Sequence, residues 1–268
     1  MVDEARKVAF INGKGGCGKS TSIFHIAGVF ASRGEKTLVI DLDKQGNTTK
    51  FLLIENEEEI EYTMFDYMNK ECAVEDIVKK AYFRTRGNAN PKYYGVDVLP
   101  FDKRFEDETL IHIDKIDIEN DLNRFIREQG YEWVIVDMPP SNKKLNHICF
   151  TQIVDNVIAP FSSDIFSVDG YADLMNIVNE ARLQTETLNI LGVYLSRYDA
   201  RCGVDRYIKS ELEQFDTFID IQIPLMADLR EGIMFGRPMS FYKQNSPSKD
   251  AYEKLADWMK IRIDELQD

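Results

Sequence analysis

Short apolar runs alternate with segments of helical periodicity along most of this chain. Seven runs predict β-strands, at residues 7–12, 37–42, 96–100, 133–138, 156–160, 190–196 and 219–223. Several are apolar at nearly every position, as expected for strands buried on both faces of a sheet. Apolar residues at helical spacing predict helices at residues 21–32, 75–81, 119–129, 168–187, 204–215 and 248–265. This alternation predicts an α/β fold, with a mostly parallel twisted sheet flanked by helices on both faces.

The remaining segments give little sign of a second unit. Residues 84–94 are rich in glycine, asparagine and proline, which predicts a surface loop. No break in composition and no repeat divides the chain, so we expect residues 1–268 to form a single domain.

The last predicted helix has one apolar face. The residues of this face recur at helical spacing: Tyr252, Leu255, Ala256, Met259 and Ile263. Acidic and basic residues are mixed on the rest of the helix, whereas a helix that binds anionic lipid is usually basic. We therefore expect this face to pack on the domain and predict no membrane association.

Composition narrows the functional classes. The net charge of −13 argues against a broad surface that coats nucleic acid, although a local basic patch remains open. The four cysteines are widely spaced and form no C-x-x-C pair, which argues against a disulfide framework or a zinc ribbon. No signal peptide or long apolar span is evident, so we expect a cytoplasmic protein.

A glycine-rich stretch lies between the first predicted strand and the first predicted helix. It contains the pattern G-x-x-x-x-G-K-S and comprises Gly13, Lys14, Gly15, Gly16, Cys17, Gly18, Lys19, Ser20 and Thr21. In this setting, inward-facing backbone N–H groups and the helix N-terminus hold a polyphosphate. We expect Lys19 to reach the β- and γ-phosphates and Ser20 to bind Mg²⁺. The Cys17 thiol either fills space in the loop or is open to oxidation, and we favour the former.

Carboxylates follow two of the predicted strands. Asp41 and Asp43 end the second strand, and Asp137 ends the strand at residues 133–138. Because ligands of open α/β sheets bind at the carboxyl ends of the strands, we expect these groups to converge on the glycine-rich loop. Asp137 fits an acid that holds Mg²⁺ through water. Each aspartate alone could equally be a helix cap or a turn residue.

Lys14 makes the motif more specific. With a lysine before the glycine pair, the loop resembles the deviant Walker A motif of the ParA/MinD group of P-loop ATPases, and within that group the chain most resembles the ParA-type partition ATPases. The supporting segments span essentially the whole chain: DLDKQGN at 41–47, DMPPS at 137–141, YDAR at 198–201, IP at 223–224, GRP at 236–238 and the final helix.

The resemblance implies a nucleotide switch with ATP and Mg²⁺ as cofactors. Two protomers of a homodimer would sandwich two ATP molecules, with Lys14 of each reaching the phosphates held by the other. Asp43 matches the residue that orients the attacking water, Asp41 would lie near the metal and phosphates, and Pro224 would contact the nucleotide. Hydrolysis to ADP and phosphate would dissolve the dimer. The resemblance further implies stimulation by a ParB-like partner, nonspecific DNA binding in the ATP state and association with the nucleoid.

Two departures from the family pattern bear on these expectations. Lys44 replaces the usual proline after the acidic pair, and residues 225–228 lack the basic residues that many chromosomal relatives carry there. A basic patch for DNA would have to come from other cations: Arg201, Arg206, Lys209, Arg230, Arg237 and Lys243. Acidic residues are interleaved with them, so an ordinary solvated surface is almost as good an interpretation.

Four other functions remain open. One is ATP-driven positioning of a cargo other than DNA. A MinD-like membrane-recruited regulator shares the loop but needs a basic amphipathic tail. A metallocluster carrier or nitrogenase-like reductase needs cysteines at a spacing that Cys72, Cys149 and Cys202 do not match. A small-molecule ligase of the same fold is harder to exclude.

Overall fold

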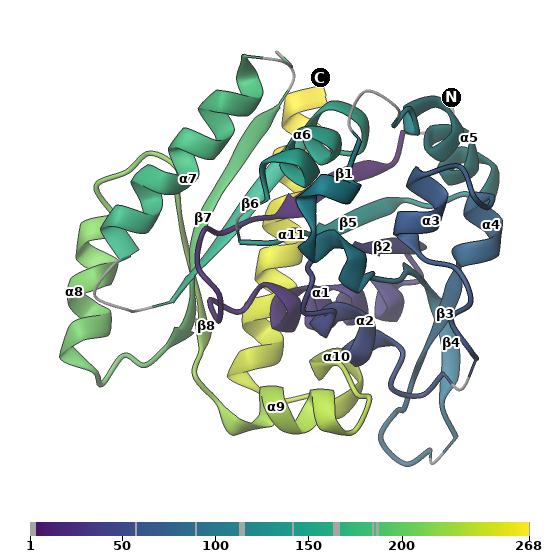
Figure 1. Ribbon diagram of the computed structural model, residues 1–268. Helices are drawn as coiled ribbons and strands as arrows, with labels where there is room; N and C mark the ends of the chain where they lie inside the picture. Colours follow the sequence, from purple (N-terminus) through teal and green to yellow (C-terminus); the bar gives the residue numbers. More distant parts are fainter. Residues whose placement is uncertain are drawn as a thin grey trace.

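The computed structural model describes residues 4–56, 58–88, 90–112, 116–140, 142–162, 167–183, 185 and 188–267 (Figure 1). Within these residues, eight strands form one sheet. In spatial order they are β3 (Lys79–Phe83), β4 (Lys92–Leu99), β2 (Thr37–Asp41), β5 (Trp133–Asp137), β1 (Arg6–Phe10), β6 (Asn156–Ser162), β7 (Asn189–Tyr198) and β8 (Phe218–Pro224). Only the β3–β4 pair is antiparallel among them, which confirms the predicted fold class.

Helices cover both faces of the sheet (Figure 1). One face packs against α1 (Lys19–Arg33), α2 (Asn47–Leu52), α9 (Ala227–Met234), α10 (Met239–Tyr242) and α11 (Pro247–Gln267). The other packs against α3 (Met64–Met68), α4 (Val74–Ile77), α5 (Glu119–Gln129), α6 (Lys143–Gln152), α7 (Ser167–Arg182) and α8 (Gly203–Leu212). Two short 3₁₀ turns, η1 (Lys103–Glu106) and η2 (Glu108–Leu110), follow β4.

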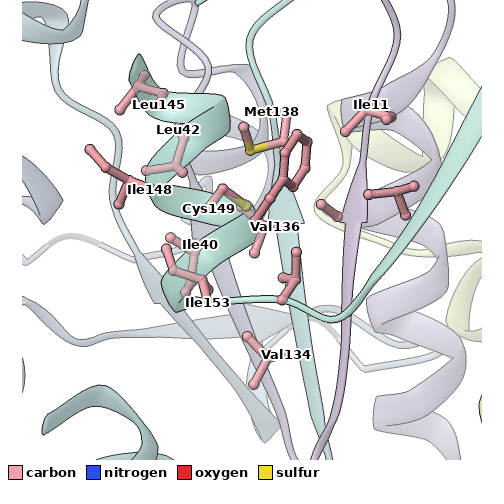
Figure 2. Close-up of a cluster of buried hydrophobic side chains, with 14 of the residues drawn as sticks. Ile11, Ile40, Leu42, Val134, Val136, Met138, Leu145, Ile148, Cys149 and Ile153 are labelled. Carbon is pink, nitrogen blue, oxygen red and sulfur yellow. The ribbon is translucent and has the colours of Figure 1, made fainter. Parts of the chain in front are cut away.

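The strands contribute alternate residues to the two cores. In β5, Val134 and Val136 belong to the core beneath α6, whereas Trp133 and Ile135 belong to the core beneath α1 and α11. Figure 2 shows the first of these cores, where side chains of α6 and the residue after it lie against β2 and β5. Burial on both faces explains why these strands are apolar at almost every position.

One outer strand of the sheet differs from the prediction. Residues 75–81 are not a helix, because α4 ends at Ile77 and residues 79–83 form the edge strand β3. The strand pairs with β4 and buries Ala81 and Phe83, which are two residues apart and share one face. β4 begins at Lys92, so the predicted surface loop at 84–94 ends earlier than expected. Five helices were not predicted: α2, α3, α6, α9 and α10.

The helix α11 agrees with the prediction for the end of the chain. The five residues of its apolar face are all at most 1% exposed and belong to the core under α1. The prediction that this face packs on the domain is therefore confirmed. Among the described residues, no helix is both long and apolar enough to cross a membrane.

His25 joins α1 to the segment that follows β8. The ring is fully buried, its Nε2 lies 3.3 Å from the carbonyl of Leu229 in α9, and its Nδ1 accepts from the N–H of Met239 in α10 at 3.2 Å. Since Nδ1 accepts, the proton of the neutral ring must be on Nε2, which donates to Leu229. Burial lowers the pKa of His25 to about 3, although the charge of nearby Asp228 acts in the opposite direction.

This buried imidazole predicts an acid-sensitive contribution to stability. The folded chain keeps His25 neutral down to a pKa of about 3, while the unfolded chain takes up the proton near the ordinary value of 6.5. As the pH is lowered from 6.5 toward 3, the unfolded chain binds this proton and the folded chain does not. The free energy of unfolding should therefore fall by about 1.4 kcal/mol for each pH unit of acidification through this one group. Urea unfolding of the wild type and of His25→Gln at several pH values measures it as the difference between the two slopes. Equal slopes would contradict the assignment.

Candidate functional site

The glycine-rich loop connects β1 to α1 in a conformation suited to phosphate. Gly16 and Gly18 have φ values of 79° and 95°, in the left-handed region that other residues seldom adopt. Gly18 is the N-cap of α1. Asn12, at the end of β1, fixes the entry to the loop by accepting from the N–H of Lys14 at 2.8 Å and donating to the carbonyl of Pro160 at 2.6 Å. Successive N–H groups in such a turn, with a helix N-terminus behind them, form an anion site.

The Asp137 carboxylate accepts hydrogen bonds from hydroxyl groups of two segments. Its Oδ2 accepts from Ser20 Oγ at 2.7 Å and from Thr48 Oγ1 at 2.6 Å. The carboxyl group is fully buried, and its Oδ1 has no hydrogen-bond partner among the described residues. Burial raises the pKa of Asp137 to about 6, and the charge of Lys19 partly offsets this rise. A buried acceptor with no partner beside a serine hydroxyl suits a water molecule on a Mg²⁺ ion, so the predicted metal residues Ser20 and Asp137 fit that ion.

Asp41 lies beside Asp137 in the register of β2 and β5. Unlike Asp137, it accepts hydrogen bonds from the protein at both carboxylate oxygens. Its Oδ2 accepts from the backbone N–H of Thr49 at 2.8 Å and from the Thr49 hydroxyl at 2.7 Å, while Oδ1 accepts from the N–H of Asp43 at 3.1 Å. Burial, and then the charge of Asp137, raise the pKa of Asp41. The geometry makes Asp41 an anchor for the loop after β2 and for the start of α2.

A cavity of about 400 Å³ opens over the loop. Residues of the loop and of the first turn of α1 form one wall, from Gly15 to Ser22. Asp43 and Gln45 line it after β2, and Ser196 and Arg197 line it from the end of β7. The remaining wall is mainly apolar: Phe51, Pro140, Ile223, Pro224, Leu225, Met226, Leu229 and Tyr252. Such a division into a polar, glycine-rich end and an apolar end suits a nucleotide, with its phosphates at the first and its base at the second.

Asp43 holds a turn at the rim of this cavity. Its Oδ1 accepts from the N–H of Gln45 at 3.0 Å and its carbonyl accepts from the N–H of Gly46 at 2.8 Å. Its Oδ2 accepts no hydrogen bond from the described residues. One carboxylate oxygen of Asp43 therefore fixes the side chain, and the other is available to a ligand or water.

Lys14 differs from Lys19 in its position. Lys19 is 5% exposed and lines the cavity, whereas Gly13 and Lys14 are absent from its lining residues. The Nζ of Lys14 lies 3.8 Å from where a Cβ on Gly170 would be, so the side chain extends toward α7. Lys19 therefore faces the cavity, whereas the side chain of Lys14 lies near α7.

The thiol of Cys17 is almost completely buried in the loop. Burial raises its pKa, and Sγ lies 3.4 Å from the carbonyl of Lys14. A buried thiol with a raised pKa is a weak nucleophile, which supports the space-filling interpretation. All four cysteines are free.

The cations proposed for DNA fall into two regions (Figure 1). Arg201, Arg206 and Lys209 lie at α8, while Arg230, Arg237 and Lys243 lie on or after α9. Four ion pairs neutralise three of these cations: Arg201 with Asp199, Lys209 with Glu213 and with Asp220, and Lys243 with Asp228. Arg206 donates to the carbonyl of Ala200 at 2.8 Å, Arg230 lines the cavity, and Nε of Arg237 is buried without a partner among the described side chains.

Several residues at the site were not predicted from the sequence. Thr48 and Thr49 bind the two buried aspartates, and Ser196 donates to the carbonyl of Cys17 in the loop. The available signal was a polar residue at or just after the carboxyl end of a strand, where ligands of such sheets bind. Ser141, the last residue of the predicted DMPPS segment, lies outside the described residues.

Comparison with protein families decides where this fold and loop belong. The family model described as an AAA domain matches residues 5–190, which contain the glycine-rich loop and all three aspartates. The chain belongs to the AAA domain family. The chain also matches relatives over almost the whole length of both sequences.

The relatives include sporulation and chromosome-partitioning proteins. The sporulation initiation inhibitor protein Soj of Bacillus subtilis is 28% identical over 254 residues, which cover 93% of this chain and 96% of Soj. The chromosome partitioning protein ParA of Caulobacter vibrioides is 29% identical over 266 residues, which cover 94% of this chain and 92% of ParA. These matches confirm the resemblance to ParA-type partition ATPases.

Solved structures share the fold of this family member. A plasmid partition protein of Borrelia burgdorferi bound to AMPPNP has a TM-score of 0.69 at 18% identity and covers 96% of this chain and 99% of its own. The cell division ATPase MinD of Pyrococcus furiosus has a TM-score of 0.70 at 22% identity, with 96% and 99% covered. Cobyrinic acid a,c-diamide synthase of Mycobacterium smegmatis with ADP and magnesium has a TM-score of 0.73 at 19% identity, with 94% and 93% covered. At these identities the likeness establishes the fold alone.

Proposed function

We propose that this chain is a Mg²⁺-dependent ATPase whose ATP-bound form dimerises and acts in DNA partition. One observation carries the proposal: the glycine-rich loop, with its two lysines, adjoins the hydrogen-bonded cluster of Ser20, Asp137 and Thr48. In this cluster the buried Oδ1 of Asp137 has no hydrogen-bond partner among the described residues. The partition relatives support the choice of this function among those possible for the fold.

The polar end of the cavity would hold the phosphates and the metal. Backbone N–H groups of the loop and the Lys19 ammonium would bind the phosphate oxygens. Ser20 Oγ would bind Mg²⁺ directly and Asp137 would hold it through water; this ion would neutralise charge on the phosphates. The relative structures with ADP and magnesium and with AMPPNP support these ligands. The apolar end, including Pro224, would receive the base and ribose.

Dimerisation would use Lys14, and hydrolysis would use Asp43. Lys14 does not line the cavity of its own chain, and by the resemblance of the loop to the deviant Walker A motif we assign it to the phosphates of a second protomer. Asp43 has one oxygen on the turn and one available, and we assign it to orienting the attacking water. A ligand that bridges two protomers biases association only as far as it binds the dimer better than the monomer, and the γ-phosphate supplies that difference.

Two kinds of cargo fit the proposed ATP cycle. A ParB-like stimulating partner and nonspecific DNA follow from the relatives rather than from a basic surface. Three of the six candidate cations are in ion pairs, and Leu225 is exposed just after Pro224. These features favour a second candidate, in which the same ATP cycle positions a cargo other than DNA.

A salt-titrated DNA-binding assay tests the cargo. The full chain is mixed with a labelled duplex of arbitrary sequence in ATP, in ADP and without nucleotide. We expect binding in ATP alone, and a loss of affinity of about 100-fold between about 50 and 200 mM salt if about four phosphates are contacted. The double variant Arg201→Ala/Arg206→Ala should weaken binding, whereas Arg262→Ala on α11, where Arg262 pairs with Glu265, is the matched control.

The outcomes of this assay separate the alternatives. Negligible DNA binding in all three states, with ATP-dependent dimerisation retained, would replace DNA partition by the positioning of another cargo. A chain that binds neither ATP nor ADP with Mg²⁺ would contradict the ATPase proposal itself.

A further inference from the structure

The end of β7 contacts the glycine-rich loop at two consecutive carbonyl groups. Arg197 Nη1 donates to the carbonyl oxygen of Gly16 at 3.1 Å. The adjacent Ser196 is 2% exposed, and its hydroxyl donates to the carbonyl oxygen of Cys17. Both residues line the cavity that holds the loop. Two side chains from a strand about 180 residues away in sequence thus fix neighbouring peptide groups of the loop.

These carbonyl groups belong to the peptide units whose N–H groups are those of Cys17 and Gly18. Because a peptide unit is planar and trans, its N–H points opposite to its C=O. A donor that binds the carbonyl therefore fixes the direction of the N–H at the other end of the same peptide unit, and N–H groups held in this way can bind an anion. The same donor polarises the peptide unit and strengthens its N–H as a donor.

The backbone of Arg197 is unusual for its residue type. Its φ is 56°, and among the described residues Lys70, with a φ of 62°, is the only other non-glycine residue in the left-handed region. A side chain there is disfavoured by contact with its own backbone. Such a conformation persists where the surroundings impose it, and it often marks a functional position.

The next residue ties the same segment to the opposite wall of the cavity. The carbonyl of Tyr198 accepts from the N–H of Leu225 at 2.9 Å, and Tyr198 is paired with Pro224 in the register of β7 and β8. Residues 196–198 therefore lie between the polar end of the cavity and its apolar end, with a hydrogen bond to each.

We propose that Ser196 and Arg197 are positioning residues that hold the loop in its phosphate-binding form, with Arg197 adding positive charge at the mouth of the site. The inference rests on the proposed nucleotide function and names residues outside the motif on which affinity depends. Neither residue is assigned to the chemistry of hydrolysis. Their effect should therefore appear in the binding of phosphates and leave turnover at saturation unchanged.

The Arg197→Gly variant separates this role from a purely structural one. Glycine accepts the left-handed backbone without strain, so the midpoint of thermal unfolding should stay close to that of the wild type. Loss of a charged hydrogen bond should weaken Mg-ADP and Mg-ATP binding by about tenfold, with turnover at saturating ATP within about twofold of the wild type. Calorimetric titration with ADP and ATP, melting of the nucleotide-free protein and steady-state turnover measure these quantities.

Matched variants complete the test. Lys70→Gly makes the same backbone change outside the cavity and should leave nucleotide affinity unchanged. Arg197→Lys keeps the charge and should bind nucleotide more tightly than Arg197→Gly. Ser196→Thr keeps the hydroxyl and should bind nucleotide more tightly than Ser196→Ala. Unchanged ADP affinity in Arg197→Gly and Ser196→Ala would overturn the proposal. A loss of ADP affinity that occurs only in variants with a lowered melting midpoint would also overturn it. If the wild type itself fails to bind Mg-ADP, the proposed nucleotide function fails instead.

Discussion

Replacing Asp43 by alanine should lower ATP turnover at saturating ATP by at least about 100-fold, the usual cost of removing a group that orients or accepts a proton from the nucleophile. Nucleotide affinity should change by less than about threefold, because the loop, Lys19 and the Asp137 cluster bind the phosphates without it. The structural basis is the uneven use of the carboxylate: Oδ1 accepts from Gln45 and Oδ2 from no described residue. Steady-state hydrolysis and calorimetric titration with ATP measure the two effects.

A second substitution at the same position controls for disruption of the turn. Asp43→Asn retains an oxygen that can accept from the N–H of Gln45, so the loop after β2 should keep its shape. It should nevertheless lose turnover nearly as strongly as Asp43→Ala, since the negative oxygen is gone. Asp199→Ala removes a carboxylate that pairs with Arg201 outside the cavity and should leave turnover unchanged. Wild-type turnover in Asp43→Asn would refute the catalytic role.

The Lys14→Ala variant should bind Mg-ATP with nearly wild-type affinity yet fail to dimerise. Lys14 lies outside the lining of its own chain's cavity, so its loss removes little from the site of that chain. In the proposed dimer the same ammonium meets a phosphate of the partner in a setting with little water, where the loss of one charged contact is strongly felt. We expect the dimerisation constant in ATP to weaken by at least about 100-fold, which corresponds to about 2.7 kcal/mol. Sedimentation velocity over a range of protein concentrations measures it.

Lys19 supplies the contrasting variant. Lys19→Ala should lose nucleotide binding itself, because Lys19 is buried against the phosphate end of the cavity. Lys249→Ala, on α11 with an ion pair to Glu253, should dimerise as the wild type does. An ATP-dependent dimer of normal strength in Lys14→Ala would contradict the assignment of this lysine to a second protomer.

The sequence predicted the central parallel strands well because each is buried on both faces. β1, β2 and β5 were located to within about two residues, as is usual for strongly patterned elements. The edge strand β3 was missed because its sequence, KKAYF, has an apolar run of only three residues and its stability depends on pairing with β4. Pairing across a hairpin is a tertiary effect that local periodicity does not contain.

The same distinction applies to the site. Lys19, Ser20 and Asp137 were predicted because a known pattern gives each a position relative to a strand end. Ser196 was not predicted, since its role depends on the Cys17 carbonyl, which only the folded sheet brings near it. Asp41 has the expected position at a strand end, but Thr49 and the backbone occupy both of its oxygens. Spacing could not reveal which of two neighbouring aspartates faces the ligand.

The shared oxygen of Asp137 has a consequence for the kinetics of binding. The hydroxyl groups of Ser20 and Thr48 come from the first turns of α1 and α2 and are both oriented by one buried carboxylate. The entropy lost in fixing these two rotors is therefore incurred when the chain folds and does not recur at each binding event. A preorganised site of this kind needs no slow rearrangement before a ligand enters, so association should proceed in a single concentration-dependent phase.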